Sequence, residues 1–346
     1  MFSFFKSKKV LGLDIGTSMI KVAEMDGNTL SNFGFMPTPS NVVAGGEITD
    51  TVSLTQVVQK LLSDLKSKRK NIVTGIWGSA VITKKITLPK MDPQLVGEQI
   101  RWEAEQYIPF DINEINLDYH VFKKPHPNPE MMDVLIVAAK RDYVFKFAEV
   151  IEASNKSCAV LDVSNFALAN CFFANYGEDI ETSAILNIGA GVTSFVVIEQ
   201  GEVLFSRDVP VGGLSYTSEI GRHLGVSLEE AENLKLSTSN SQEVPQEVQN
   251  VIQSTHDSVG EEIRRTFDFY TATGNENPVR RIFYTGGASL TSGLVQSLNS
   301  LLQITLEPMN PFQKIKPNSS KISSEHIPYM TNIAAVSMGL GMRRLE

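Results

Sequence analysis

Two short turns in this chain have the residue types that suit phosphate binding. In the first, "VLGLDIGTSMIKVAEM", a strand-like run leads straight into Asp14, Gly16, Thr17 and Ser18 and then resumes as a strand. Small residues let neighbouring backbone N–H groups converge on an anion, and glycine adopts backbone angles closed to other residues. Thr17 and Ser18 add hydroxyl donors, and Lys21 adds positive charge. This turn predicts a phosphate-binding loop, although an ordinary tight hairpin has the same pattern.

Asp14 needs a separate role, because a carboxylate does not bind a phosphate directly. Mg²⁺ is held in proteins by one or two carboxylates together with phosphate oxygens and water. We therefore expect Asp14 to hold Mg²⁺ through a water molecule.

The second turn lies in "AILNIGAGVTSFVVIEQG". Its small and polar residues are Asn187, Gly189, Ala190, Gly191 and Thr193. An offset of 173 residues carries Asp14 onto Asn187 and Gly16 onto Gly189, so each turn sits between two strand-like runs. The repeat is short, but it predicts a fold of two related lobes, each presenting one turn.

Three further stretches could complete a ligand site. "TGGASL" and "PVGG" are tight turns before helices, where a flat ligand can lie against the backbone. They contain Gly286, Gly287, Ala288, Ser289, Gly212 and Gly213. "EEIRRTF" offers Glu261, Arg264 and Arg265, which could meet a ribose and a purine ring, since arginine stacks on flat rings. The same charges also fit the solvated face of a helix.

Alternating and helical periodicities place these turns between defined elements. The strands predicted cover 9–15, 18–26, 28–36, 71–77, 81–88, 115–122, 133–139, 158–163 and 280–284. The helices predicted cover 51–68, 93–107, 142–154, 165–175, 214–224, 227–236, 245–272, a helix from 289, and 331–344. This alternation indicates an α/β fold.

Composition excludes several classes of protein. The 346 residues carry a net charge of −8, which argues against bulk nucleic-acid binding. The two cysteines, Cys158 and Cys171, have no metal-ligand spacing, so we expect buried free thiols in a reducing compartment. There is no Walker-type GxxxxGK[ST] loop, no GxGxxG after a strand, no histidine pair and no Gx-Ser-xG elbow.

The amino-terminal stretch "MFSFFKSKK" has two interpretations. No apolar run reaches the roughly 18 residues of a membrane span, and the stretch lacks the apolar core of a signal peptide. It is either a loose terminus or a contact in which Phe2, Phe4 and Phe5 meet a partner or a membrane surface, helped by lysines. We expect a cytoplasmic protein whose membrane contact is peripheral.

Taken together, "GLDIGTSMIKVA", "ILNIGAGVTSFVVI", "EEIRRTF" and "TGGASL" resemble the nucleotide-cleft elements of the actin, sugar-kinase and chaperone ATPase superfamily. The resemblance implies two lobes of related fold with ATP between them. It assigns 14–18 and 187–193 to the phosphate loops. It assigns Glu261, Arg264, Arg265 and 286–289 to the adenosine side.

A narrower resemblance covers nearly the whole chain. "KKITLPKMDPQLVGEQIRWEAEQYIPFDINEINLDYHV", "EEIRRTFDFY" and "NPFQKI" are similar to stretches of the PilM family of type IV pilus assembly. That family resembles FtsA in carrying a small subdomain inside the first lobe. The resemblance implies an ATP-binding adaptor at the inner face of the inner membrane, in which the cytoplasmic tail of PilN docks in a groove of the first lobe. The pilus motor ATPase and the platform protein are further candidate partners.

This resemblance fixes the expected domains. The first lobe covers 1–160 with the inserted subdomain at about 80–155. The second covers 161–330 with a helical subdomain at about 214–280, and a C-terminal helix at 331–346 returns toward the first lobe.

The segment around 94–111 has two interpretations of its own. Its charged and aromatic residues include Trp102, Glu105, Tyr107, Ile108 and Phe110. If they line an exposed groove they form a partner site, because aromatic side chains dominate binding energy. If they are buried, they form the core of the small subdomain.

One residue departs from the superfamily pattern. The second phosphate loop usually carries an aspartate that helps to hold Mg²⁺, and this chain has Asn187 there. The missing charge–charge interaction is about 4 kcal/mol at 4 Å with an effective dielectric constant near 20, and a bridging water reduces it. We therefore expect ATP binding with slow or no hydrolysis. The alternatives left open are a small-molecule kinase or active ATPase of the same fold, an FtsA-like filament former, and a nucleotide-free scaffold.

Overall fold

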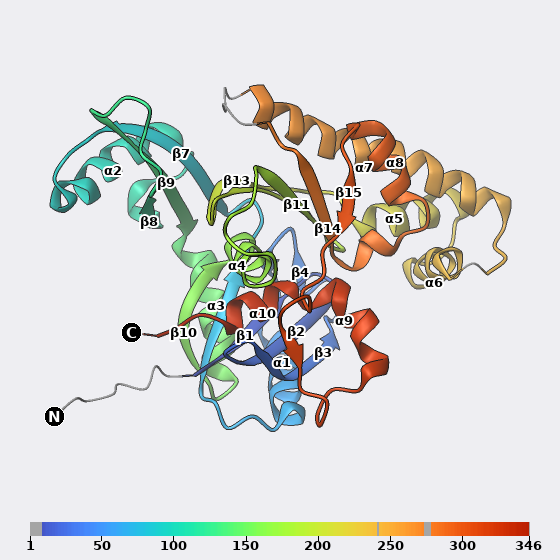
Figure 1. The fold of residues 1–346 in the computed structure, drawn as a ribbon. Helices are drawn as coiled ribbons and strands as arrows, with labels where there is room; N and C mark the ends of the chain where they lie inside the picture. Colours follow the sequence, from blue (N-terminus) through green and yellow to red (C-terminus); the bar gives the residue numbers. More distant parts are fainter. Residues whose placement is uncertain (1–8, 241, 273–277, 346) are drawn as a thin grey trace.

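The computed structural model describes residues 9–240, 242–272 and 278–345. Phe2, Phe4 and Phe5 of the proposed amino-terminal contact lie outside this range. Figure 1 shows two α/β lobes, one above the other, and a smaller α/β unit beside the upper lobe. This is the two-lobed fold with an inserted subdomain that the sequence predicts. Within the described ranges, no helix has the length and apolar character that crossing a membrane requires.

The first lobe is built on a mixed sheet with the strand order β10-β6-β1-β2-β3-β16. Its strands are β1 (Val10–Ile15), β2 (Met19–Asp26), β3 (Thr29–Pro37), β6 (Asn71–Ile76), β10 (Ser157–Val163) and β16 (Lys316–Pro317). β1 is buried throughout, because it is paired on both sides and covered on both faces. Leu11, Leu13 and Ile15 pack under helices α1 (Thr51–Leu65) and α3 (Arg141–Ala153), while Val10 faces the core between the lobes.

The second lobe repeats this sheet. Its order, β13-β12-β11-β14-β15, matches β3-β2-β1-β6-β10 strand for strand. The strands are β11 (Ser183–Ile188), β12 (Thr193–Glu199), β13 (Glu202–Val209), β14 (Arg281–Thr285) and β15 (Leu306–Pro308). Asp14 pairs with Lys21 in the first hairpin, and Asn187 pairs with Ser194 in the second. The same offset thus relates both partners, which confirms the duplicated core.

The inserted subdomain has its own small core. Its sheet has the order β7-β9-β8, formed by β7 (Val81–Pro89), β8 (Ile115–Val121) and β9 (Met131–Lys140). Helix α2 (Pro93–Tyr107) covers one face, and Val96, Ile100 and Ala104 are its buried residues. Pro93 occupies the first turn of this helix, which starts at 93 as the sequence predicts, and the Asp92 side chain caps it. The short helix η1 (Ile112–Glu114) joins α2 to β8.

Helices cover the outer face of the second sheet. They are α5 (Gly213–Leu224), α6 (Leu228–Ser239), α7 (Gln246–Ala272) and α8 (Leu294–Leu302), with the short helix η2 (Gly287–Leu290) before α8. On α7, Val259, Ile263 and Tyr270 are buried and form part of the side of the helix that faces the core. The remaining short elements are β4 (Val43–Ala44), β5 (Glu47–Ile48) and η3 (Ser324–His326).

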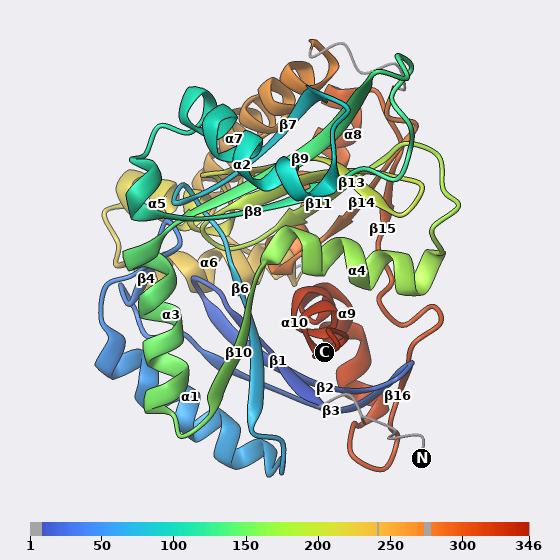
Figure 2. The same ribbon diagram turned by 90° about the vertical axis from the view of Figure 1, so that its left-hand side faces the viewer.

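Two helices fill the space between the lobes. Figure 2 shows α4 (Ser164–Tyr176) and α10 (Ala335–Gly341) between the two sheets. Glycines let α10 approach its neighbours closely, because a methyl group at Gly339 would lie 1.8 Å from the Ala167 carbonyl oxygen of α4. A methyl group at Gly12 of β1 would lie 2.1 Å from the Ser337 carbonyl oxygen. The contact depends on backbone meeting backbone.

The single helix expected over 331–346 is wrong in detail. The structure has α9 (Ile327–Ile333) followed by α10, which ends at Gly341. The Asn332 carbonyl accepts a hydrogen bond from the Gly286 backbone N–H at 2.9 Å. The end of α9 is therefore bonded to the second lobe next to the break between the helices. Residues 316–317, inside the range expected for the second lobe, pair with β3 of the first sheet.

Candidate functional site

The two glycine turns touch each other across the lobes. A methyl group in place of a Gly191 hydrogen would lie 2.6 Å from Thr17 Oγ1 and 3.2 Å from the Thr17 Cβ. Thr17 belongs to the turn after β1 and Gly191 to the turn after β11. The sheets therefore direct their equivalent hairpins at one another, which agrees with the superfamily resemblance, in which both turns lie at the cleft between the lobes.

Both turns close in the same way. The Gly16 N–H donates to the Met19 carbonyl at 3.1 Å, and the Gly189 N–H donates to the Val192 carbonyl at 2.9 Å. A Cβ at Gly16 would lie 2.9 Å from the Met19 carbonyl oxygen, and a Cβ at Gly189 would lie 2.9 Å from the Val192 carbonyl oxygen. Both positions therefore leave no room for a Cβ. The first turn is also braced from outside, since the Thr38 hydroxyl donates to the Gly16 carbonyl at 2.8 Å.

Asp14 has a cation as its direct neighbour. Lys21 Nζ lies 2.7 Å from Asp14 Oδ2, and the two side chains are only 13% and 9% exposed. The pair forms because the residues are directly opposite on β1 and β2, where side chains on one face meet. A nearly buried carboxylate is thereby neutralised beside the first turn.

The second hairpin has two uncharged residues at the equivalent positions. Asn187 is half-buried and stands opposite Ser194. The Ser194 hydroxyl donates to Asp208 Oδ1, and the Thr193 hydroxyl donates to the Val211 carbonyl, each at 2.8 Å. Thr193, expected to bind phosphate, therefore directs its hydroxyl at the segment after β13 and holds that segment beside the turn.

The other glycine-rich turns gather around the second turn. The Gly213 N–H donates to the Gly189 carbonyl at 3.0 Å, and the Leu214 N–H donates to the Ala190 carbonyl at 2.8 Å. A methyl group at Gly212 would lie 2.3 Å from the Gly189 carbonyl oxygen. The start of α5 is thus fixed directly on the turn.

The 286–289 segment also reaches this point. A methyl group at Gly286 would lie 2.3 Å from the Ile188 carbonyl oxygen, and one at Gly213 would lie 3.2 Å from the Ala288 Cβ. The buried Ser289 hydroxyl donates to the Gly286 carbonyl at 2.7 Å and closes the turn, while Gly287 is exposed.

A buried lysine that sequence reasoning missed stands beside these turns. Lys235 of α6 is 7% exposed, and its ammonium donates to the Gly213 carbonyl and the Thr217 hydroxyl at 3.1 Å each. Glu232 Oε2 lies 2.6 Å from the same ammonium. Lysines are rarely this buried unless they are paired. The available signal was the Glu232-x-x-Lys235 spacing, which puts both side chains on one face of a helix after "PVGG".

The charges of "EEIRRTF" lie elsewhere. Arg264 is 3.6 Å from Glu261 and 3.7 Å from Asp268, and Arg265 is 2.8 Å from Glu262, all along the exposed side of α7. Over the described ranges, neither arginine has a hydrogen bond or ion pair to the glycine turns. The charged pair beside Gly213 is formed instead by Glu232 and Lys235.

The predicted partner groove divides into a surface and a core. Trp102 is 73% exposed and Tyr107 is 46% exposed, and Glu105 is exposed near them on α2. Ile108 is buried in the subdomain core, so it has the structural role left open above. Phe110 is half-buried, with the Lys140 ammonium 4.5 Å from the centre of its ring.

The cysteines are free. Cys171 is buried as expected, but Cys158 is only half-buried, because it lies on β10 at the edge of the first sheet. Burial raises the pKa of the Cys158 thiol to about 11 and that of Cys171 to about 12. Both thiols stay protonated at neutral pH, so neither acts as a nucleophile there.

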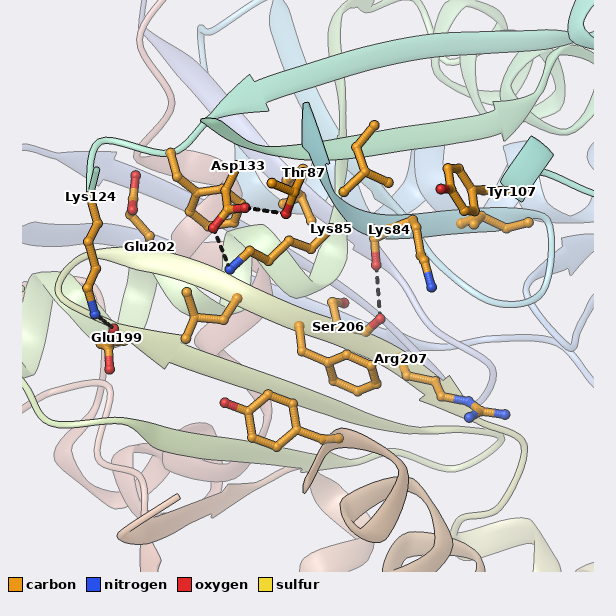
Figure 3. Close-up of a pocket in the computed structure, with 18 of the residues that line it drawn as sticks. Lys84, Lys85, Thr87, Tyr107, Lys124, Asp133, Glu199, Glu202, Ser206 and Arg207 are labelled. Atoms are coloured by element: carbon orange, nitrogen blue, oxygen red, sulfur yellow. Dashed lines mark hydrogen bonds and ion pairs between the residues drawn. The ribbon is translucent and has the colours of Figure 1, made fainter. Parts of the chain in front are cut away.

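A cavity of about 1090 Å³ lies between the inserted subdomain and the second lobe. Figure 3 shows β7 above and β13 below, with Lys84, Lys85 and Thr87 on one side and Ser206 and Arg207 on the other. We call this cavity, lined by β7, β13, the end of α7 and the 124–127 loop, the trough.

Comparison with known proteins bears out the fold. A solved structure of EutJ from Carboxydothermus hydrogenoformans matches with a TM-score of 0.56 at 16% identity, over 95% of this chain and 89% of that one. MreB 5 of Spiroplasma citri bound to AMPPNP matches at 0.51 and 11% identity, over 88% and 92%. The cell division protein FtsA of Bacillus subtilis is 22% identical over 253 residues, which are 65% of this chain and 57% of FtsA.

Narrower matches point to one family. The solved structure described as the PilM-PilN type IV pilus biogenesis complex aligns with a TM-score of 0.87 at 29% identity, over 97% of this chain and 98% of that one. The family described as type IV pilus assembly protein PilM matches residues 12–345. The chain therefore belongs to the PilM family of type IV pilus assembly proteins, with an actin-like fold.

Proposed function

We propose that this chain is a cytoplasmic, ATP-binding adaptor of type IV pilus assembly that works at the inner face of the inner membrane. The cytoplasmic tail of a PilN-like membrane protein docks on its first lobe. ATP with Mg²⁺ binds between the lobes and is hydrolysed slowly or not at all. The pilus motor ATPase and the platform protein are further proposed partners, and nucleic acid is not one.

The observation that carries the nucleotide part is the contact between Thr17 and Gly191. Two glycine turns with the same closing hydrogen bond meet there, one from each lobe. A ligand that contacts both turns must bind both lobes at once. A triphosphate suits this position, because turns of small residues present backbone N–H groups to anions.

The surrounding residues fit a nucleoside triphosphate. Lys21 supplies positive charge near the first turn and holds Asp14 in place at 2.7 Å. Lys235 and Glu232 supply a buried ammonium and a carboxylate beside Gly213, where a ribose or base can be recognised. When bound, ATP supplies the negative charge that the two lobes share.

Mg²⁺ would be held by few protein groups. Of the residues described, no three histidine, cysteine, aspartate or glutamate side chains cluster into a metal site. Asp14 and Asn187 are the two side chains at equivalent positions after β1 and β11, so Asp14 would act through water and Asn187 only weakly. This suits an ion that keeps most of its waters and takes phosphate oxygens as ligands.

Slow hydrolysis follows from the same pair of positions. Asn187 keeps an acceptor oxygen but has no charge with which to fix a metal or a water molecule. The two turns can therefore hold the nucleotide while its turnover stays low. Occupancy rather than hydrolysis would then set how the lobes close.

The partner part depends on the exposed α2 surface. A tryptophan with 73% of its surface in water is a strong anchor for a partner, because buried aromatics contribute most of an interface's binding energy. Glu105 and Tyr107 lie exposed on the same helix. The relative at 29% identity is a complex with PilN, which supports a PilN-like tail as the occupant.

The test is a thermal-shift series on the full chain with Mg-ATP, Mg-ADP and a synthetic peptide of the tail of the PilN-like protein encoded beside it. A ligand at 100 times its Kd raises the unfolding free energy by about 2.7 kcal/mol. We expect both nucleotide and peptide to raise Tm. Asp14→Ala should remove the nucleotide shift alone, and Trp102→Ala the peptide shift alone.

The matched control is Leu228→Ala, which removes a 63% exposed apolar side chain from α6 in the second lobe. It should leave both shifts unchanged. A Tm shift with nucleotide that survives Asp14→Ala, or no Tm shift with any nucleotide, would refute the proposed nucleotide site between the lobes. A Tm shift with the peptide that survives Trp102→Ala would refute docking of the tail on the α2 surface.

A further inference from the structure

The trough has one wall from each lobe. β7 is one of the two edge strands of the subdomain sheet, and β13 is one of the two edge strands of the second sheet. The Thr83 hydroxyl of β7 donates to the Ser206 carbonyl of β13 at 2.9 Å, and the Gly78 N–H, in the segment before β7, donates to Asp208 Oδ2 at 2.7 Å. Beyond these contacts the walls separate around the cavity of about 1090 Å³.

Four charged side chains of the trough form two ion pairs with one another. Lys85 Nζ lies 2.8 Å from Asp133 Oδ2, and Lys124 Nζ lies 2.9 Å from Glu199 Oε2. These ion pairs fix one wall of the cavity and the 124–127 loop at its end. Two further carboxylates of the lining, Glu202 and Asp208, accept hydrogen bonds from the backbone N–H groups of Lys123 and Gly78.

Two cations differ from the rest. Lys84 and Arg207 are exposed, and within the ranges described neither has a carboxylate as an ion-pair partner. Each lies instead over an aromatic ring, Lys84 Nζ 5.8 Å from the centre of Tyr107 and the Arg207 guanidinium carbon 5.5 Å from that of Phe269. Figure 3 places Lys84, Arg207 and Tyr107 toward the same end of the trough.

Such an end is suited to an acidic group. A carboxylate between the two cations would gain two ion pairs, and Arg207 can bind it with two parallel hydrogen bonds. Tyr107 and Phe269 are each 46% exposed and would pack against the same ligand. The remaining length runs along the edge strand β13, where an extended backbone can pair with a strand.

We propose that the trough binds an extended, acidic peptide segment of a partner protein, with its carboxylates at Lys84 and Arg207. This site shares Tyr107 with the exposed α2 surface around Trp102, but its cations lie on β7 and β13, and it goes beyond the adaptor function proposed above. Because its walls belong to different lobes, the bound segment links the inserted subdomain to the second lobe.

The experiment selects peptides from a random twelve-residue display library on the full chain and measures their Kd by fluorescence anisotropy. We expect enrichment of Asp and Glu, and a Kd that rises at least tenfold with Lys84→Glu or Arg207→Glu. Exchanging one acidic residue of the peptide for lysine should restore binding to the charge-reversed variants. Raising the salt concentration should weaken binding to the wild type.

The matched control is Lys60→Glu, an exposed charge reversal on α1 of the first lobe. It should leave Kd within twofold, as should Trp102→Ala, so failure of the α2 proposal would not affect this result. All three reversed lysine and arginine positions are exposed, and circular dichroism checks that the variants fold. A library that yields no binder, or binders equally tight for the Lys84→Glu/Arg207→Glu double variant, overturns the proposal.

Discussion

Gly191 stands against the side chain of Thr17, with no space between the two turns for a Cβ. The contact joins equivalent hairpins of two lobes that are related by a repeat of only a few residues. The two lobes can therefore approach this closely at the proposed nucleotide site only because residue 191 has no Cβ.

Gly191→Ala should therefore weaken nucleotide binding. The added Cβ would lie 2.6 Å from Thr17 Oγ1, so the turns must move apart. We expect at least a tenfold higher Kd for Mg-ATP, measured by isothermal titration, with Tm lowered by only a few degrees. Thr17→Ala removes the contacting hydroxyl, so adding it to Gly191→Ala should recover part of the affinity. Additive losses in the double variant would contradict a steric cause.

Asn187→Asp should raise ATP turnover. The substitution adds a carboxylate at the position equivalent to Asp14, which can hold Mg²⁺ and its waters more firmly. We expect at least a tenfold increase in phosphate release, measured with Mg-ATP in excess. Asn187→Ala is the control, because it removes the amide without adding charge and should not increase turnover. A wild-type chain that releases several phosphates per second would already disprove slow hydrolysis.

Gly339→Ala should lower the free energy of unfolding. The new methyl group would lie 1.8 Å from the Ala167 carbonyl oxygen, so α10 must move away from α4. Overpacking of this kind costs about 3 kcal/mol, at the upper end of the usual range. The free energy of unfolding in urea measures it.

Gly97→Ala on α2 is the matched control for that measurement. Its methyl group would have only Tyr119 atoms nearby, at 3.8 Å, and alanine favours a helix by up to about 1 kcal/mol over glycine. The two substitutions should thus change the free energy of unfolding in opposite directions. Equal effects would mean that the α4–α10 approach is not tight.

The sequence predicted the two hairpins because strand, glycine and strand follow one another locally. It could not show that Thr17 and Gly191 touch, since this depends on how two distant sheets face each other. It also could not tell which face of a helix meets the cleft. The charges of Glu261 and Arg264 suggested a site, yet they point to solvent along α7, while Lys235 on α6 is buried beside Gly213.

The prediction of one continuous terminal helix was wrong for a related reason. Its apolar periodicity runs through 331–344 without a proline, so local rules predict one helix. Just before the break, the Asn332 carbonyl accepts a tertiary hydrogen bond from the Gly286 N–H, which local rules cannot predict. Apolar character likewise did not separate Trp102, which is exposed, from Ile108, which is buried in the subdomain core. Only packing distinguishes them.

His256 should make the chain less stable in mild acid. It is 2% exposed, its Nε2 lies 2.9 Å from the Ser292 carbonyl and its Nδ1 lies 2.8 Å from the Tyr216 hydroxyl. The carbonyl can only accept, so Nε2 carries the proton and Nδ1 accepts from the hydroxyl in the neutral ring. Burial lowers the pKa of His256 below its ordinary value of 6.5, although the Ser292 hydrogen bond and Asp257 oppose the shift.

The sign of the effect follows from this lowered pKa. Above pH 6.5 the ring is neutral in both states, whereas below it the unfolded chain binds a proton that the folded chain resists. Stability is then lost as pH falls, by up to about 1.4 kcal/mol per pH unit. His256→Gln should flatten the slope of unfolding free energy against pH between 7 and 5, whereas His326→Gln, at an exposed position, should not. Equal slopes for wild type and His256→Gln would show that another group controls the acid response.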